Sequence, residues 1–355
     1  MSERRTVVAI ATPLKADLVA RIARVDDRLE VHFEPDLLQP LRLGCDHRGT
    51  EPFRRTPDQD RRWRQLLADA EVLLGIPDGS GAGLAEAVRT GSRLRWVQST
   101  AEGAGEQVRA AGLTDQELGR VMVTSATDVH AGPLAEFAIL GMLAFTKALP
   151  RLIADKQARR WEHHPMAELA GSTVLVVGLG SVGLEVARLA KAFGMRVVAV
   201  NRNGRTDSPH VDEIRTARFL PDLLPVAHSV VLTLPLTERT RGLIDAAAIG
   251  RMHSGAVVVD VGHGGVLDEA ALVQALQQGR LAGAALDAFT AEPLPADSPL
   301  WDLPNVLLSP HTAGLTEREN ERMVGAFIEN LRRYLAGTEL LNTITRTGSD
   351  GGGQR

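Results

Sequence analysis

The feature that most constrains the fold is a strand, a glycine-rich turn and a helix in the middle of the chain, 174-VLVVGLGSVGLEVARLA-190. The turn consists of Gly178, Leu179, Gly180, Ser181, Val182 and Gly183. We expect Gly178 to permit a tight turn, Gly180 to let the backbone approach a pyrophosphate, and Gly183 to allow close packing of the helix on the strand. The pyrophosphate would lie on the free N–H groups at the start of the helix. The motif predicts a parallel α/β sheet that binds a dinucleotide.

Short β-branched runs alternate with amphipathic segments along most of the chain, which is typical of βαβ units in parallel sheets. The first third contains five such runs, at 6–10, 29–33, 72–76, 94–99 and 121–125. A second series follows Leu169, with the runs TVLVVGLG, RVVAVNR, SVVLTLP, AVVVDVG, AGAALDAF and NVLLSPH. The pattern predicts two doubly wound α/β domains of Rossmann-like or flavodoxin-like type.

The chain closes with a charged helical pattern over 317–337 that has no strands of its own to pack on after Pro310. We expect this helix to return to the first lobe, with hinges near Ala126 and His311. The expected division is a discontinuous substrate domain at 1–126 and 315–345, a dinucleotide-binding domain at 127–314, and a disordered tail at 346–355.

Composition excludes several classes of function. A net charge of −4 and a pI near 6.2 give no reason to expect nucleic acid or an acidic membrane surface as a partner. The single cysteine, Cys45, cannot form an internal disulfide, which fits a reducing compartment. Pro13 and Lys15 cut short the first apolar run, which favours a strand over an export signal. No apolar run approaches the roughly 18 residues that span a bilayer. We therefore expect a soluble, cytoplasmic protein.

The segment 133-PLAEFAILGMLAFTKAL-149 predicts a helix that is too apolar to face water along its whole length. Two interpretations are open at this stage. The helix packs within a lobe, or it forms an interface between subunits.

The segment 47-HRGTEPFRRTPDQDRRWR-64 contains six arginines and three acidic residues. A basic patch with Trp63 could bind phosphates. The simpler interpretation is a solvated loop that leads into a helix capped near Asp58, and we favour it.

The end of the strand 196-RVVAVNRNGR-205 bears on the choice between NAD(H) and NADP(H). An acidic residue at this position would hold the adenosine ribose hydroxyls of NAD. The chain has Asn201 there, followed by Arg202 and Arg205. A carboxylate would repel a 2′-phosphate, whereas guanidinium groups attract one, so the sequence favours NADP(H) over NAD(H). The alternative is that Arg202 lies over the adenine and NAD(H) is accepted.

Four stretches together resemble the D-2-hydroxy acid dehydrogenase family. They are the glycine turn, 231-VLTLPLTERTRGLI-244, 256-AVVVDVGHGGVLDEAAL-272 and 285-ALDAFTAEPLPADSPLWDLPNVLLSPHTAG-314. The resemblance extends to 133-PLAEFA-138 and 95-RWVQSTAEGA-104 and so covers most of the chain. It implies two Rossmann-like lobes with a cleft between them and a homodimer held largely by the helix at 133–149. It also implies hydride transfer between nicotinamide and a small 2-oxo acid, in the manner of glyoxylate and hydroxypyruvate reductases.

The resemblance places the family's acid–base histidine at His311 in SPHTAG and its carboxylate partner at Glu292 in AEPLP. Chemistry supports this pair independently, because reduction of a ketone needs a proton on oxygen as hydride arrives at carbon, and imidazole can supply it. A hydrogen-bonded carboxylate would also fix the tautomer of the ring. Considered alone, a histidine after Pro310 and a glutamate before Pro293 would more often be structural.

Further residues match positions that line the family's binding sites. Asp287 in LDAF matches the acid near the nicotinamide carboxamide. The other cofactor-lining matches are Pro235, Thr240, Val261, Gly262 and Gly314. Glu102 and Gly103 match the loop whose backbone amides hold the substrate carboxylate, although the loops TSATDVHAG and AEGAG depart from the usual pattern.

The largest departure is at the family's third catalytic residue, an arginine, whose position is taken by His263. Arginine gives a permanent charge and a two-pronged grip on carboxylate and carbonyl oxygens, whereas histidine gives one donor and a charge that depends on pH. His263 could act as a weaker anchor, or an arginine from the 47–64 segment could replace it. The substrate could be unusual, activity could be very low, or the histidine could only fill the turn.

The leading hypothesis is an NADP(H)-preferring reductase of small 2-oxo acids, D-stereospecific, in which His311 and Glu292 act as the acid–base pair and His263 anchors the substrate. One alternative is a weak or inactive cofactor-binding sensor or interaction protein on the same fold. Another is an oxidoreductase that acts on a non-carbonyl oxyanion such as phosphite or formate.

Overall fold

The computed structural model describes residues 5–40, 53–100 and 104–344. The chain divides into two compact units, which we call unit 1 (Met1–His130 with Leu315–Arg355) and unit 2 (Ala131–Gly314). The sequence placed the first division four residues earlier, after Ala126, and the second at the same point. The predicted tail at 346–355 lies outside the described residues.

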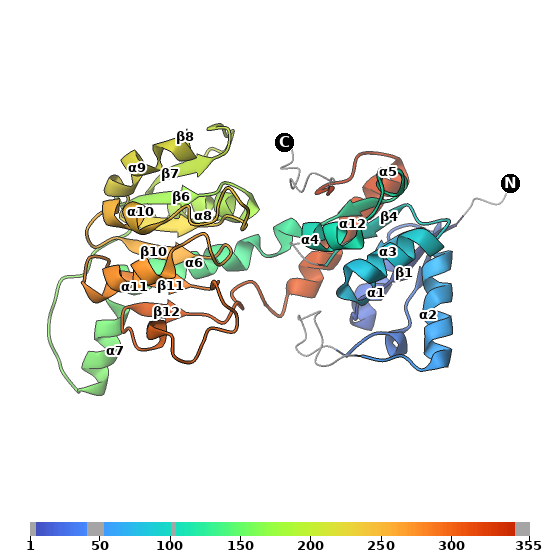
Figure 1. Ribbon diagram of the computed structural model, residues 1–355, viewed down its shortest axis with the longest axis horizontal. Helices are drawn as coiled ribbons and strands as arrows, with labels where there is room; N and C mark the ends of the chain where they lie inside the picture. Colours follow the sequence, from blue (N-terminus) through green and yellow to red (C-terminus); the bar gives the residue numbers. More distant parts are fainter. Residues whose placement is uncertain (1–4, 41–52, 101–103, 345–355) are drawn as a thin grey trace. The chain divides into compact units, whose positions relative to one another are not determined.

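Unit 1 contains a five-stranded parallel sheet in the order β2-β1-β3-β4-β5 (Figure 1). Its strands are β1 (Thr6–Ile10), β2 (Leu29–His32), β3 (Val72–Leu74), β4 (Trp96–Gln98) and β5 (Met122–Thr124). Its helices are α1 (Ala16–Ala23), α2 (Pro57–Asp69), α3 (Gly81–Thr90), α4 (Ala104–Ala111), α5 (Asp115–Arg120) and α12 (Glu319–Ala336), with short 3₁₀ turns at Pro35–Leu37, Pro77–Gly79 and Thr127–Val129.

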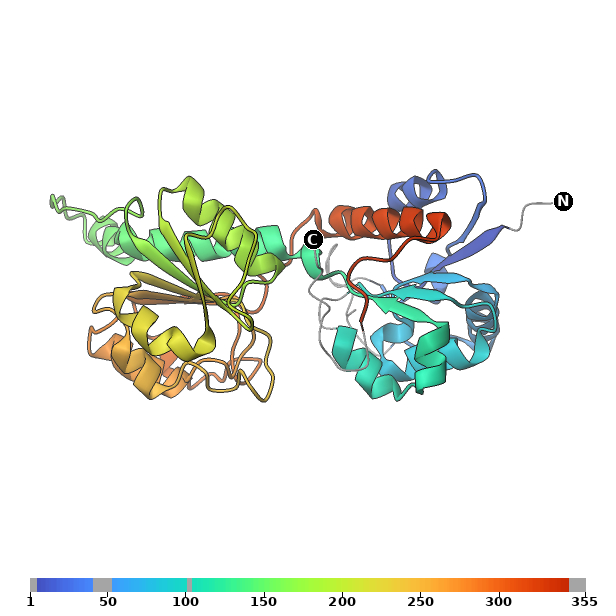
Figure 2. The same cartoon turned by 90° about the horizontal axis from the view of Figure 1, so that it is seen from above.

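Helices cover both faces of the unit 1 sheet. Successive side chains of a strand point to opposite faces, so each strand contributes to two core clusters. Val8 and Ile10 of β1 pack in one cluster with α1 and α12, whereas Ala9 packs in the opposite cluster with α2 and α3. Figure 2 shows α12 and α1 on one side of this sheet and α2 to α5 on the other. Phe327 of α12 stacks on Trp96 of β4, with ring centroids 5.0 Å apart. The closing helix is therefore part of the unit 1 core.

Unit 2 contains a seven-stranded parallel sheet in the order β12-β11-β10-β9-β6-β7-β8. Its strands are β6 (Thr173–Val177), β7 (Arg196–Asn201), β8 (Glu213–Thr216), β9 (Ser229–Leu232), β10 (Val257–Asp260), β11 (Gly283–Leu286) and β12 (Val306–Leu308). Its helices are α6 (Ala131–Thr146), α7 (Leu149–Gln157), α8 (Ser181–Ala192), α9 (Leu220–Leu223), α10 (Ala246–Arg251) and α11 (Glu269–Gln277), with 3₁₀ turns at Ala217–Phe219, Leu224–Val226 and Pro299–Trp301.

The unit 2 sheet is also covered on both faces, with α6 and α8 on one side and α9 to α11 on the other (Figure 2). Two parallel sheets with helices on both faces confirm the predicted fold class. The polar strand β8 was not predicted. It pairs with β7 at the edge of the sheet, where its side chains are only partly buried or exposed.

Helix α6 is the apolar helix expected at 133–149, but it ends at Thr146 and Ala148 has a positive φ of 50° before α7 begins. A helix over Asp128–Thr146 is long and apolar enough to cross a membrane by length and composition, so the expectation that no segment approaches that length was wrong. More than half of it is buried, and Gly141 brings α6 close to Val259 and Ala285 of the sheet. A core helix passes the same test, so no membrane role follows.

Candidate active site

The glycine turn between β6 and α8 has the backbone geometry that its sequence requires. Gly178 has a φ of 107°, in the region that favours glycine, and its carbonyl accepts a hydrogen bond of 2.8 Å from the Thr233 hydroxyl. A β-carbon on Gly183 would overlap that same carbonyl, so only glycine lets the first turn of α8 pack this close to β6. Val182 is buried in the sheet core and Leu179 packs partly against it.

The start of α8 is open to an anionic group. Gly180 occupies the N-cap and provides no side-chain cap for the first N–H groups of the helix, which begins at Ser181. A β-carbon on Gly180 would meet no atom within 4 Å, so there is space beside the backbone. Uncapped N–H groups and the helix dipole favour a phosphate at this end. The turn therefore fits the pyrophosphate of a dinucleotide.

The loop after β7 is organised by Asn201. Its side-chain oxygen accepts a hydrogen bond from Gly204 N at 2.7 Å, and its side-chain nitrogen donates to the Arg205 carbonyl at 2.8 Å. The sequence analysis assigned Asn201 to cofactor selection, but in the structure its side-chain amide stabilises the turn that contains it. Arg202 and Arg205 are exposed on this turn.

The two arginines differ from other cations in this part of unit 2. Lys191 pairs with Asp212 at 2.9 Å, Arg196 with Glu213 at 2.6 Å, and Arg188 with Glu185 at 2.6 Å. Within the described residues, by contrast, neither Arg202 nor Arg205 forms a salt bridge. Their charges are available to a bound anion.

The loop after β9 is held by its own hydroxyl groups. Thr240 donates a hydrogen bond of 2.6 Å to the Pro235 carbonyl, and its hydroxyl accepts one of 2.8 Å from Thr237 N. This loop joins the next one along the sheet, because Gly242 N donates to the Gly265 carbonyl at 2.8 Å. The two expected cofactor-lining residues, Pro235 and Thr240, therefore lie in one hydrogen-bonded turn that follows β9.

His311 and Glu292 meet after the last two strands of the sheet. His311 Nδ1 lies 2.9 Å from both carboxylate oxygens of Glu292. Glu292 Oε1 also accepts a hydrogen bond of 3.0 Å from Phe289 N, which orients the carboxylate. His311 has a φ of 54°, a strained conformation for a residue with a side chain, and its side chain is 46% exposed. The bidentate contact fixes Nδ1 on the carboxylate, so Nε2 is the nitrogen that remains for chemistry.

Asp287 anchors the turn that carries His311. It is buried, 3% exposed, and its Oδ1 accepts hydrogen bonds of 2.9 Å from both Thr312 N and Ala313 N. Two backbone donors on one carboxylate oxygen hold the strained His311 backbone in place. The sequence assigned Asp287 to the cofactor and did not reveal this anchoring. Gly314 follows the same turn as the last residue of unit 2.

His263 lies in the loop between β10 and α11, beside the residues that hold Glu292. A β-carbon on Gly264 would overlap the backbone of Phe289, so only glycine allows the two loops to touch. Glu269, at the start of α11, accepts a hydrogen bond from Thr290 N and joins the same two loops. His263 is exposed, and Val261 before it is buried. The structure therefore brings the His263 loop against the loop that leads from Asp287 to Glu292.

The sequence missed Asp260, the last residue of β10. It is 2% exposed, and its Oδ1 accepts a hydrogen bond of 2.9 Å from Gly262 N. Burial raises the pKa of this carboxyl group to about 7, helped by the neighbouring Glu269 and Asp287 carboxylates and opposed by the Gly262 hydrogen bond. An acid at the end of a run of valines, VVVD, was the available signal.

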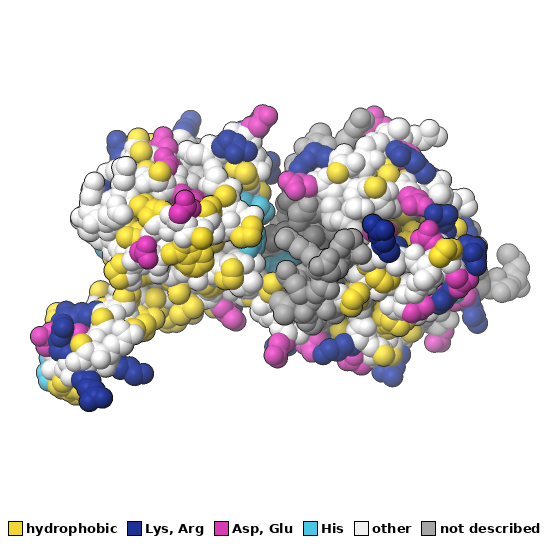
Figure 3. Space-filling view, turned by 60° about the horizontal axis from the view of Figure 1, so that its bottom comes forward, with side chains coloured by type: hydrophobic (Ala, Val, Ile, Leu, Met, Phe, Trp, Pro, Cys, Tyr) yellow, Lys and Arg dark blue, Asp and Glu magenta, His cyan; other side chains and the backbone are white. Residues whose placement is uncertain are grey.

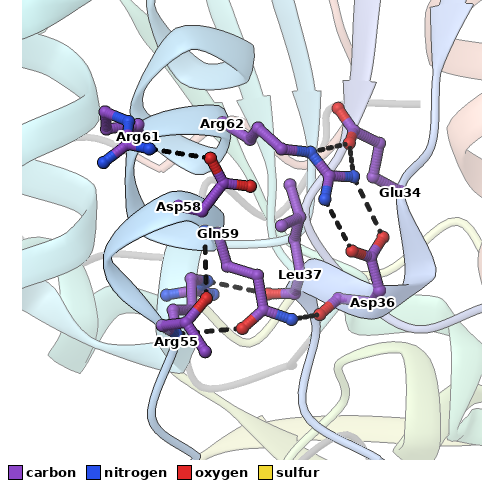
Figure 4. A network of polar contacts seen from close by, with 9 residues as sticks. Glu34, Asp36, Leu37, Arg55, Asp58, Gln59, Arg61 and Arg62 are labelled. Carbon is purple, nitrogen blue, oxygen red and sulfur yellow. Dashed lines mark hydrogen bonds and ion pairs between the residues drawn. The ribbon is translucent and has the colours of Figure 1, made fainter.

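The arginine-rich segment belongs to unit 1, and four of its arginines pair with acidic residues there (Figure 4). Arg62 pairs with both Glu34 and Asp36, and Arg55 pairs with Asp78 at 2.7 Å while lying 4.1 Å from the centre of the Trp63 ring. Arg61 pairs with Asp58 and Arg64 with Asp60. These pairings favour the structural interpretation over a phosphate site.

The N-cap of α2 is Thr56, which forms a capping box with Gln59, so the cap expected near Asp58 lies two residues earlier. Glu102 and Gly103, expected to bind the substrate carboxylate, lie outside the described residues.

An open helix start after a glycine turn, with an imidazole–carboxylate pair on loops of the same parallel sheet, defines a dinucleotide-binding unit equipped for proton transfer. Comparison with known proteins agrees. Residues 139–313 match the family model "D-isomer specific 2-hydroxyacid dehydrogenase, NAD binding domain". The chain is 30% identical over 341 residues to a glyoxylate/hydroxypyruvate reductase B of Citrobacter koseri, which covers 93% of this chain and 98% of that protein. The chain belongs to the D-isomer specific 2-hydroxyacid dehydrogenase family, which confirms the resemblance seen in the sequence.

A second protein and one solved structure are also similar to this chain. An (S)-sulfolactate dehydrogenase of Chromohalobacter salexigens is 34% identical over 221 residues, which covers 61% of this chain and 70% of that protein. A D-isomer specific 2-hydroxyacid dehydrogenase of Xanthobacter autotrophicus Py2, solved in complex with NADPH and MES, is 27% identical with a TM-score of 0.73, covering 96% of this chain and 99% of that one.

Proposed function

We propose that this protein is an NADP(H)-preferring, D-stereospecific reductase of small 2-oxo acids. The observation that carries the proposal is the bidentate contact between His311 Nδ1 and the Glu292 carboxylate, in the unit that also carries the glycine turn. The family match and the glyoxylate/hydroxypyruvate reductase relative support the same chemistry.

In this proposal a bound nicotinamide supplies the hydride for the carbonyl carbon. His311 delivers the proton that the carbonyl oxygen needs at the same stage, and Nε2 is the nitrogen that exchanges it. Glu292 holds Nδ1–H, keeps the ring in the required tautomer and stabilises the imidazolium form before transfer. In the reverse direction, the neutral ring accepts the hydroxyl proton.

His263 would bind the anionic substrate where the family uses arginine. A protonated imidazole gives a charge-assisted hydrogen bond but only one donor toward the substrate. The contact of Gly264 with Phe289 supports this role, because it fixes the His263 loop against the loop of the acid–base pair. We expect the anchor to hold best at the lower end of the working pH range.

The preference for NADP(H) would come from Arg202 and Arg205. Both are exposed on a turn that Asn201 organises, and within the part of the chain that the structure describes both lack carboxylate partners of the kind that neutralise Lys191 and Arg196 nearby. A 2′-phosphate carries the charge that two guanidinium groups can bind, often in bidentate form. The NADPH complex of the Xanthobacter relative is consistent with this choice.

We further propose a homodimer formed through α6 and the segment that follows it. Several apolar side chains are exposed along this region: Leu140 (48%), Leu149, Leu152, Ile153, Trp161 (92%) and Met166. Figure 3 shows the arm that contains α7 projecting from unit 2. Large exposed apolar side chains gathered on one segment are typical of an interaction surface.

The test is NADPH consumption with glyoxylate, hydroxypyruvate, phenylpyruvate and branched 2-oxo acids. We expect turnover of at least one, and a chiral assay of the product of any turned-over acid other than glyoxylate, whose product is achiral, should find the D-isomer. Protein fluorescence with NADPH alone provides the control for cofactor binding. Absence of turnover on every acid, with the cofactor bound, would overturn the proposal.

A further inference from the structure

Asp260 places a carboxyl group where the sheet is otherwise apolar. Val257 and Val259 of β10 face one core cluster, whereas Val258 faces the other, so Asp260 shares the face of Val258. Its register partners on the two neighbouring strands are Leu232 and Leu286, both buried. No role assigned above to the acid–base pair or to the cofactor site uses this group.

The carboxyl group forms part of the turn that leads to His263. Asp260 Oδ1 accepts the Gly262 N–H at 2.9 Å, which closes a short loop directly before the histidine. Gly262 is confined on its other side, because a β-carbon there would lie 2.6 Å from the Leu234 carbonyl oxygen. The position of His263 therefore depends on the hydrogen bond between Gly262 N and Asp260 Oδ1 and on the position of that oxygen.

Among the described residues, the two charged groups that act on Asp260 are both acidic. Asp287 follows β11 and Glu269 begins α11, and β9 contributes only Leu232 at this level of the sheet. Each of these acids anchors a loop: Asp287 holds the Thr312–Ala313 turn, and Glu269 holds Thr290 N. An ionised Asp260 would repel both anchors, and no cation among the described charges that act on it compensates.

We propose that Asp260 is a positioning residue of the candidate site, whose carboxyl group is neutral in the competent state and whose ionisation loosens the loops that carry His263 and His311. This inference rests on the proposed function. Burial between two leucines disfavours the charged form, and the raised pKa of about 7 puts the change within reach of ordinary assay conditions. The neutral acid keeps Oδ1 as the acceptor for Gly262 while removing the repulsion.

The decisive variant is Asp260→Asn, because the amide keeps an oxygen acceptor of nearly the same shape and stays neutral at every pH. Asp268→Asn is the matched control on the same loop. Asp268 caps α11 by accepting Ala271 N at 3.0 Å, and asparagine caps a helix equally well. Both variants remove one carboxylate, but only Asp260→Asn removes a buried one.

Infrared difference spectroscopy of the full chain tests the protonation directly and needs no turnover. We expect a carboxylic acid C=O band at pH 6 that disappears above pH 8. It should be absent in Asp260→Asn and retained in Asp268→Asn. A wild-type protein without this band at pH 6, or a band that Asp260→Asn leaves in place, would overturn the inference.

Kinetics test the positioning role. We expect kcat/KM to fall as the pH rises from 6 to 8.5, and to fall at least about threefold less in Asp260→Asn than in wild type. The difference should lie partly in the KM for the oxo acid, since His263 is its proposed anchor. Asp268→Asn should follow the wild-type profile. Parallel profiles for wild type and Asp260→Asn would overturn the positioning role even if the infrared band behaved as expected.

The two proposals fail in different ways. If no oxo acid is turned over, the proposed reductase function falls while the infrared result still reports on Asp260. If turnover is found but the Asp260→Asn profile matches wild type, the function stands and Asp260 is only a structural residue.

Discussion

Two groups of loops at the carboxyl ends of the unit 2 strands use polar groups in opposite ways. After β6 and β7, Gly180 provides no side-chain cap for the start of α8, and Arg202 and Arg205 have no carboxylate partner among the described residues. After β10, β11 and β12, the backbone donors are occupied by carboxylates, with Asp260, Asp287 and Glu292 each accepting at least one N–H.

The difference teaches what each group of loops must do. A phosphate brings its own negative charge, so its site needs only unoccupied donors and space. A proton donor must be held in one orientation, which requires anchors that are satisfied before the substrate arrives. Two of these acids, Asp260 and Asp287, are buried, and burial raises the pKa of Asp260 to about 7.

The largest expected effect comes from removing the proton donor in the second group. His311→Asn should lower kcat by about 10²–10⁴-fold, because general acid–base catalysis contributes that much. NADPH binding, measured by fluorescence titration, should be unchanged, since the glycine turn is untouched. Glu292→Gln should lower kcat less, because the ring remains. A His311→Asn enzyme with near-normal kcat would contradict the assignment.

The next effect concerns stability. The pKa of Asp260 is raised from 3.8 to about 7 in the folded protein, so between these values the folded state holds a proton that the unfolded state has lost. Stability from this group is present below pH 4 and is lost as the pH rises to 7, at up to about 1.4 kcal/mol per pH unit. Chemical denaturation of wild type and Asp260→Asn at pH 5, 6, 7 and 8 should show the variant gaining relative stability up to pH 7 and no further. A constant difference would contradict the raised pKa.

The sequence predicted the parts of the site that lie within short motifs. The turn from Gly178 to Gly183 was predicted because the spacing of its glycines reflects local backbone geometry: Gly178 has a positive φ, and a β-carbon on Gly183 would overlap the Gly178 carbonyl. Most strands of both sheets were predicted because their apolar runs are buried, as in β1, β6, β9, β10 and β11. Strand β8 was missed because an edge strand buries little and needs no apolar pattern.

The anchors could not be predicted in the same way. Asp260 lies between Leu232 and Leu286 only because of the register of three strands, and Asp287 reaches Thr312 from 25 residues away. Asn201 was interpreted as a cofactor contact because the sequence does not show that its amide closes its own turn. Strand register and the hydrogen bonds of a side chain to its own turn are properties of the folded chain that a residue pattern does not specify.

A smaller effect tests the first group of loops. The double variant Arg202→Ala/Arg205→Ala should raise the KM for NADPH by roughly 10- to 100-fold, since two charge-assisted contacts of about 1.5–3 kcal/mol each are partly offset by solvation. The KM for NADH should hardly change. Arg196→Ala is the matched control, because Arg196 begins the strand β7 that leads to this turn and is paired with Glu213. Equal losses for NADPH and NADH would show that these arginines do not bind the 2′-phosphate.

The smallest expected effect is a pH dependence of the KM for the oxo acid, which would arise from His263 in the second group of loops. If protonated His263 anchors the substrate, the KM for the oxo acid should rise about fivefold as the imidazole loses its charge, because charged hydrogen bonds exceed neutral ones by about 1 kcal/mol. The experiment belongs in the Asp260→Asn background, where the buried acid no longer contributes to the profile. His263→Arg in that background should make the KM independent of pH between 6 and 8, while the KM for NADPH stays the same. Identical pH profiles for the two proteins would mean that His263 does not bind the substrate through its charge, and that the second group of loops works through His311 and its anchors alone.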